Sequence, residues 1–186
     1  MGLSGWLRRR PRGTDAGVGA WRAAWLDAVR APDPDRLAAL EIALRRAPPL
    51  ADDLELEEEM LDGLRQLVAL KGELDEGRLP RIDTTHRVVG LDLCHFSAPV
   101  SMPDDPAQPT GRLLLTSTRA VFAGGTRTPG LPWHAAREVS HDGRDLVLVR
   151  AGAEDGYRFR CNSFADALCG AAIARHLVQQ RTTIIR

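Results

Sequence analysis

The chain has 186 residues, of which 44% are hydrophobic and 27% are charged, and its formal net charge at pH 7 is zero. This composition is typical of a soluble globular protein and excludes a fibrous or wholly disordered chain. The balanced charge also argues against a nucleic-acid binder, because a domain that neutralises several phosphates normally carries a marked excess of basic residues.

Residues 1–14 are expected to form a flexible basic N-terminus. Apolar side chains are followed there by a run of arginines, a combination that favours the surface of an anionic membrane. The membrane contacts in this interpretation are Trp6, Leu7, Arg8, Arg9 and Arg10. The alternative is a solvated tail, because about ten residues bury little apolar area on their own. No secretory segment follows the arginines, so we expect the protein in the cytoplasm.

Two helices follow from apolar spacing and from proline. Trp21 and Trp25 are four residues apart, on one face of a helix that is predicted to end before Pro32. Asp33 is then an N-cap candidate with a proline directly after it, where proline is favoured. A second helix is predicted from there to Pro48.

A third helix is predicted from near Asp52 toward Gly77. Its apolar residues repeat at a spacing of seven, and they include Leu54, Met60, Leu61, Leu67, Val68 and Leu74. We expect this stripe to pack inside the chain, and the alternative is a homodimer through the same face. The three helices form a helical unit at 15–79, which ends where a proline and a change of period coincide at 78–81.

The remaining residues contain short apolar runs that are typical of strands. Two strands near 113–115 and 121–122 are predicted to meet in a tight hairpin at 117–118, and two more are predicted at 146–149 and 157–161. We expect these strands to share one core, lined by Leu113, Leu115, Val121, Phe122, Leu148 and Phe159. After the last strand, Asn162 or Ser163 is predicted to cap a long C-terminal helix.

This order of elements resembles the PH-like barrels of the bacterial PH and GRAM-domain families. The stretch LLLTSTRAVF at 113–122 is similar to the strand that reads LxLTxxRLxF in those families, and LPWHAA at 131–136 lies where they have an IPLxxI segment. The resemblance implies an α+β fold, in which about three N-terminal helices precede a PH-like antiparallel β-barrel or sandwich capped by a C-terminal helix. The PH-like domain then covers 80–186.

No residue is predicted to be catalytic or to bind a metal or cofactor. Cys94 and His95 are neighbours in a predicted strand, so their side chains point to opposite faces and cannot easily share one metal ion. The three cysteines are expected to be small buried hydrophobes. The sequence has no GxSxG motif, and its glycine-rich stretches lack the lysine of a phosphate-binding loop. We therefore expect that the protein is not an enzyme.

The resemblance also raises the question of lipid binding. In lipid-binding members, basic residues cluster near the loop that joins the first two strands, whereas the corresponding loop at 101–110 has two acids and no basic residue. We therefore expect a non-catalytic cytoplasmic interaction or scaffolding module that binds a protein partner. Candidate contacts are Trp133, Arg119 and Arg127, and Trp133 is either a surface anchor or a core plug. The alternative function is a peripheral membrane-binding module that uses the N-terminal segment.

Overall fold

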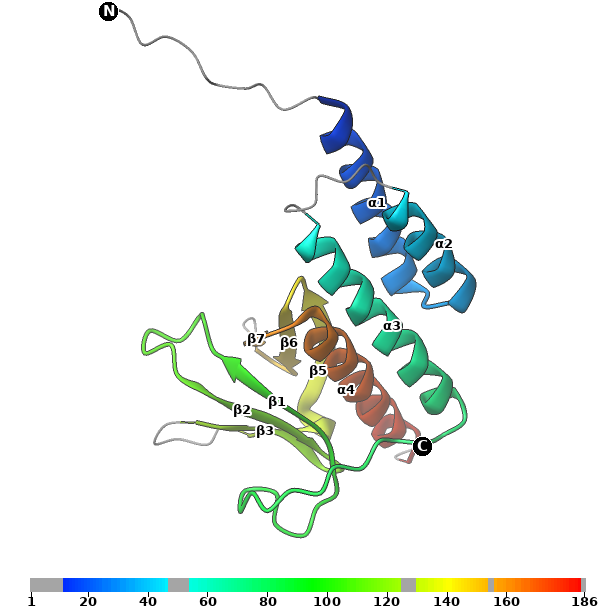
Figure 1. Ribbon diagram of the computed structural model, residues 1–186. Coiled ribbons are helices and arrows are strands. Elements are labelled where there is room, and N and C mark those ends of the chain that lie inside the picture. Colours follow the sequence, from blue (N-terminus) through cyan, green and yellow to red (C-terminus); the bar gives the residue numbers. More distant parts are fainter. Residues whose placement is uncertain (1–11, 47–53, 125–129, 154–155, 185–186) are drawn as a thin grey trace, which may run out of the picture.

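The protein is known from a computed structural model that describes residues 12–46, 54–124, 130–153 and 156–184. Within these residues, three helices precede a seven-stranded antiparallel sheet, and a fourth α-helix packs against the sheet (Figure 1). The helices are α1 (Arg12–Arg30), α2 (Pro34–Arg45), α3 (Glu55–Asp75) and α4 (Phe164–Ile184). The strands are β1 (Cys94–Ser101), β2 (Thr110–Thr116), β3 (Arg119–Ala123), β4 (Gly130–Pro132), β5 (Ala136–Asp142), β6 (Asp145–Arg150) and β7 (Gly156–Cys161). This α+β PH-like arrangement confirms the predicted fold class.

Local capping explains where several helices begin and end. The Asp33 carboxylate accepts hydrogen bonds from the backbone N–H groups of Asp35 and Arg36, at 2.8 and 3.2 Å, so α2 has the predicted N-cap. Gly77 adopts a φ of +74°, a left-handed conformation that favours glycine, and α3 stops just before it. The Ser163 hydroxyl accepts from Asp166 N at 3.1 Å and caps α4.

The strands are arranged in the order β4-β3-β2-β1-β7-β6-β5, so β4 and β5 are the two edges of the sheet. As predicted, β2 and β3 meet at the turn formed by Ser117 and Thr118. Leu113 pairs with Phe122, and both side chains point into the main core, which also contains Leu115, Leu148 and Phe159.

Val121 was assigned to this core from the sequence, and that assignment is wrong. Its side chain lies in a separate cluster with Val89, Cys94 and Leu114. The reason is the period of two in a strand, which sends Val121 to the face opposite its neighbour Phe122. The two faces of the β1–β2–β3 part of the sheet therefore belong to two different apolar clusters.

Helix α4 is apolar on two sides and belongs to two cores. Ala167, Ala171 and Ala174 are fully buried against the sheet, where small side chains allow a close approach. Phe164 and Leu168 point the other way and belong to the core of the N-terminal helices. A helix that is apolar on two sides needs a packing partner on each of them. The sheet covers one apolar side of α4, and the N-terminal helices cover the other.

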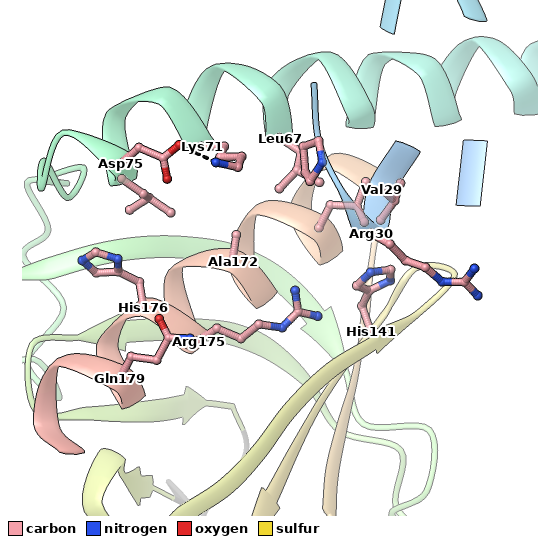
Figure 2. Close-up of a pocket in the computed structure, with 13 residues that line it drawn as sticks. Val29, Arg30, Leu67, Lys71, Asp75, His141, Ala172, Arg175, His176 and Gln179 are labelled. Carbon is pink, nitrogen blue, oxygen red and sulfur yellow. Dashed lines mark hydrogen bonds and ion pairs between the residues drawn. The ribbon is translucent and has the colours of Figure 1, made fainter. Parts of the chain in front are cut away.

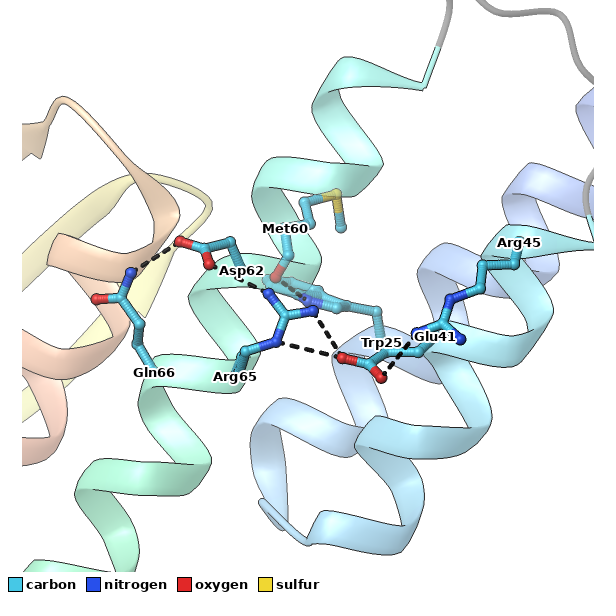
Figure 3. A network of polar contacts seen from close by, with 7 residues as sticks. All are labelled: Trp25, Glu41, Arg45, Met60, Asp62, Arg65 and Gln66. Atoms are coloured by element: carbon cyan, nitrogen blue, oxygen red, sulfur yellow. Dashed lines mark hydrogen bonds and ion pairs between the residues drawn. The ribbon is translucent and has the colours of Figure 1, made fainter.

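The N-terminal helices are held together by buried indoles and an exposed ion-pair network (Figure 3). Trp25 Nε1 donates to the carbonyl of Met60 at 2.7 Å, which links α1 to α3. Arg65 on α3 reaches Glu41 on α2 at 2.6 Å. Leu61 lies in this core and is 7% exposed. The apolar stripe of α3 is therefore covered within one chain, as predicted, and homodimer formation stays a prediction that needs another surface.

Helix α3 contacts α4 along its length and ties the two parts of the chain together. Glu59 on α3 accepts a hydrogen bond from the Phe164 backbone N–H at 3.1 Å and forms an ion pair with Arg144 in the β5–β6 turn. The Arg144 guanidinium lies over the Phe164 ring, 5.4 Å from its centroid. The boundary predicted at 78–81 lies in the connection between the N-terminal helices and the sheet. Both of these pack against α4.

Candidate binding surfaces

The three residues predicted to contact a partner have different positions in the structure. Trp133 is 1% exposed, and its indole Nε1 donates to the Thr116 carbonyl at 2.8 Å, so it is a core residue and cannot anchor a partner at the surface. Arg119 is exposed on β3, and its guanidinium donates to the Val88 carbonyl at 3.1 Å. Arg127 lies outside the described residues.

The N-terminal membrane contacts predicted from the sequence, Trp6, Leu7, Arg8, Arg9 and Arg10, also lie outside the described residues. In the part of the chain that the structure describes, no helix is long and apolar enough to cross a membrane.

Acidic side chains pair with the arginines near the β1–β2 loop. Asp104 in this loop lies 3.3 Å from Arg158 on β7. Asp145 is buried and accepts from both Arg158 and Arg160, at 3.0 and 2.7 Å, and the hydrogen bond from Arg160 is the main reason that the pKa of Asp145 is lowered. Two cations that a phosphorylated headgroup would need are thus already engaged with carboxylates.

The cysteines and the buried histidine have structural surroundings. Burial raises the pKa of Cys161 and of Cys169 to about 12, so neither is a thiolate at neutral pH. His95 is buried, with Nδ1 2.7 Å from the Pro80 carbonyl and Nε2 2.9 Å from the Ser117 hydroxyl. A carbonyl only accepts, so Nδ1 carries a proton. The described residues contain no group of three potential metal ligands.

Residues 82 to 93, the 82–93 loop, follow α3, lead into β1 and are fixed on the sheet. Val89 of this loop is buried on the outer face of β1–β3. The carboxylate of Asp92 accepts from the hydroxyl of Thr118, the carbonyl of Leu93 accepts from the backbone N–H of Ser117 at 2.9 Å, and the carbonyl of Val88 accepts from Arg119. The C-terminal half of the loop is therefore anchored to the β2–β3 turn, and its first residue, Ile82, pairs with Cys94 at the start of β1.

Apolar side chains of the 82–93 loop are nevertheless exposed. Leu91 follows Gly90, which adopts a φ of +63°, and the Leu91 side chain is fully exposed. Ile82 and Leu93 are each more than a third exposed, and the two lie on adjacent paired segments because Ile82 bridges to Cys94. Because hydrogen bonds hold the backbone next to Leu91, this exposed side chain is already positioned to contact an apolar surface of a partner.

A cleft of about 220 Å³ lies where α1, α3, α4 and β5 meet (Figure 2). Its cationic lining comes from Arg30, Lys71 and Arg175, and its histidines are His141 and His176. Asp75 is the only carboxylate in the described lining, and it forms an ion pair with Lys71. Gln179 and several apolar side chains complete the lining, and the apolar ones include Val29, Leu67, Leu74, Leu168 and Ala172.

Arg175 in this cleft differs from Arg65 and Arg160, because those two arginines are paired with carboxylates. Its Nε donates to the Val139 carbonyl at 3.1 Å, and no carboxylate of the described residues forms an ion pair with it. The surrounding protein lowers the pKa of Arg175 by removing water from the guanidinium, whereas carboxylates raise the pKa of Arg65 and Arg160. Burial, and then the charge of Arg175, lowers the pKa of His141 in the same cleft.

The sequence matches no protein family, and no curated protein is similar enough to count as a match. Among solved structures, the chain is similar to a crystal structure of the N-terminally truncated linker-DH/PH domains of p115-RhoGEF, at 13% identity and a TM-score of 0.39. The similarity covers 91% of this chain and spans 56% of the other. The PH-like description of this chain rests on the order of its strands and on α4.

Sequence reasoning missed both surfaces. The exposed Leu91 lies in a segment with no regular period, and its only signal was a glycine before an isolated apolar residue. The cleft had no sequence signal, because Arg30, Lys71 and Arg175 are far apart in the chain and each resembles an ordinary solvated side chain.

Proposed function

We propose that the protein is a non-catalytic binding module that recognises a protein partner through the 82–93 loop. The observation that carries this proposal is the fully exposed Leu91 on a loop whose neighbouring residues are hydrogen-bonded to the β2–β3 turn. A fixed backbone loses little conformational freedom on binding, so an apolar side chain at its tip contributes most of its burial energy to affinity. A PH-like fold is compatible with such a role, although fold alone does not define function.

Charge favours a protein over a membrane as the partner of this loop. The 82–93 loop contains Arg87 but also Asp83 and Asp92, so with His86 neutral it carries no excess of basic residues. Attraction to an anionic bilayer needs a basic excess, at about 1 kcal/mol for each lysine or arginine near the surface. A small apolar patch with charges of both signs at its rim is typical of protein interfaces.

Affinity capture with single-residue variants tests the proposal. The immobilised full chain, the variant Leu91→Asp and the control Leu56→Asp are each exposed to extract of the source organism. Leu56 is also an exposed leucine, but it lies in the first turn of α3, remote from the 82–93 loop and at a position where an acid suits the helix dipole (Figure 1). We expect a protein that the wild type and Leu56→Asp retain, and at least about tenfold less of it on Leu91→Asp.

Two results would contradict this function. One is equal capture by the wild type and Leu91→Asp, because the loop would then contribute nothing. The other is binding of the wild type to anionic vesicles that Leu91→Asp abolishes, because the apolar tip would then insert into lipid. Leu91→Asp is expected to leave the unfolding temperature unchanged, since its side chain has no burial to lose.

A further inference from the structure

The cleft between the N-terminal helices and the sheet combines one oriented arginine with an apolar wall. Arg175 projects from α4 toward β5, where its Nε donates to the Val139 carbonyl (Figure 2). This bond fixes the plane of the guanidinium, and a guanidinium fixed in this way presents its terminal N–H groups as a fork that matches a carboxylate. Every described carboxylate that could neutralise it is engaged elsewhere or lies outside ion-pair distance.

The other lining residues define what else a ligand of this cleft would need. Lys71 is already paired with Asp75, and Arg30 with Asp27, so of the three Lys and Arg side chains in the described lining, Arg175 is the one without a carboxylate partner. One such charge matches a monoanion. Leu67 and Ala172 contribute apolar wall, which suits a hydrocarbon body. The cleft volume of about 220 Å³ leaves room for a short-chain acid.

We propose that this cleft binds a small organic monocarboxylate, whose carboxylate pairs with Arg175 and whose hydrocarbon part lies on Leu67 and Ala172. The site is separate from the 82–93 loop and does not depend on the function proposed for that loop. Because its walls come from α1, α3, α4 and β5, a bound acid would contact both the N-terminal helices and the PH-like part of the chain.

The test is a titration of the full chain followed by ¹H–¹⁵N correlation spectra, in a buffer without carboxylate or phosphate. Hexanoate is the probe, and hexanamide is the uncharged control of nearly the same shape. We expect saturable shifts for the amides around Ala172, Arg175 and His141 with hexanoate and none with hexanamide. Replacing Arg175 by glutamine should weaken hexanoate binding about tenfold or more, because a charge-assisted hydrogen bond is lost.

A second variant and a control keep the test decisive if Arg175→Gln alters the fold. Ala172→Leu fills the apolar half of the cleft and leaves Arg175 in place, so it should abolish the hexanoate shifts. Arg150→Gln removes an exposed arginine of β6 outside the cleft and should change nothing. Equal binding of hexanamide, shifts that do not saturate, or hexanoate binding unaffected by Ala172→Leu would overturn the proposal. Saturable binding of inorganic phosphate without binding of hexanoate would overturn the assignment to a carboxylate.

Discussion

A substitution at Gly63 tests how closely α3 packs against α4. A methyl group added there would lie 3.0 Å from Ala165 N, 3.0 Å from Phe164 Cβ and 3.1 Å from Phe164 C, so it would meet the first turn of α4 and mostly its backbone. That turn cannot move freely, because Glu59 holds the Phe164 N–H. Gly72, two and a half turns further along the same helix, has nothing within 4 Å of such a methyl group.

These two glycines form a matched pair with opposite expected signs. Gly72→Ala should stabilise the protein by about 0.5 to 1 kcal/mol, which is the helix preference of alanine over glycine. Gly63→Ala has the same gain, but overpacking of about 1 to 3 kcal/mol opposes it, so a net loss of up to about 2.5 kcal/mol is expected. At about 2 to 4 °C per kcal/mol for a chain of this size, Gly63→Ala should lower Tm by up to about 10 °C.

Thermal unfolding followed by circular dichroism, together with urea titrations at 25 °C, measures both variants against the wild type. Gly72→Ala is the control for helix propensity, since the two substitutions are chemically identical. If Gly63→Ala raises Tm as much as Gly72→Ala does, then α3 and α4 do not approach as closely as described, and the shared core would be refuted.

Three further predictions follow from the packing and the titratable groups. Phe122→Ala should destabilise the protein by about 3 to 5 kcal/mol in urea unfolding, and a near-neutral value would contradict its place in the core. Because the pKa of His141 is lowered from its ordinary value of 6.5, the unfolded chain binds its proton first, so stability should fall as pH drops below about 6.5. In His141→Gln this part of the pH dependence should disappear. An unchanged pH profile would contradict the assignment of this pH dependence to His141. A chain that begins at Arg81 should aggregate in light scattering, since Phe164 and Leu168 lose their cover, whereas a monodisperse folded fragment would show that the sheet and α4 are independent.

Features that depend on adjacent residues were predictable from the sequence. Asp33 and Ser163 cap their helices through bonds to residues two or three positions away, and Pro34 marks the start of α2. The β2–β3 hairpin was equally local, since two short apolar runs lie close together and the strands built on them are separated by only Ser117 and Thr118. In each case the physical cause lies within a few residues of its signal, which is why the pattern predicted the element.

Features that depend on distant contacts were not predictable. Strand β5 was missed because it is an edge strand, with polar residues on both faces and no period of two to reveal it. Phe164, Leu168 and Ala171 recur at helical spacing in the sequence, but the structure divides them between two cores. The sequence spacing shows that these residues are apolar, and only the presence of α3 on one side and the sheet on the other decides which way each one points.

The candidate surfaces were the least accessible to sequence reasoning. Asp92 resembles an ordinary turn residue until its carboxylate is seen to hold Thr118, and this contact joins positions far apart in the chain. Trp133 had two alternatives open in the sequence, because an aromatic residue after a hairpin is as compatible with a partner contact as with burial. Its hydrogen bond to Thr116 and its 1% exposure place it inside the protein.

Photocrosslinking at position 91 tests the proposed partner surface most directly. The full chain carrying Leu91→p-benzoylphenylalanine is irradiated in cells of the source organism, and the same substitution at Leu56 is the control for an exposed leucine elsewhere. We expect one discrete protein adduct at position 91 that is absent at position 56. Lipid adducts at position 91, or the same adducts at both positions, would contradict a protein-binding function of the 82–93 loop.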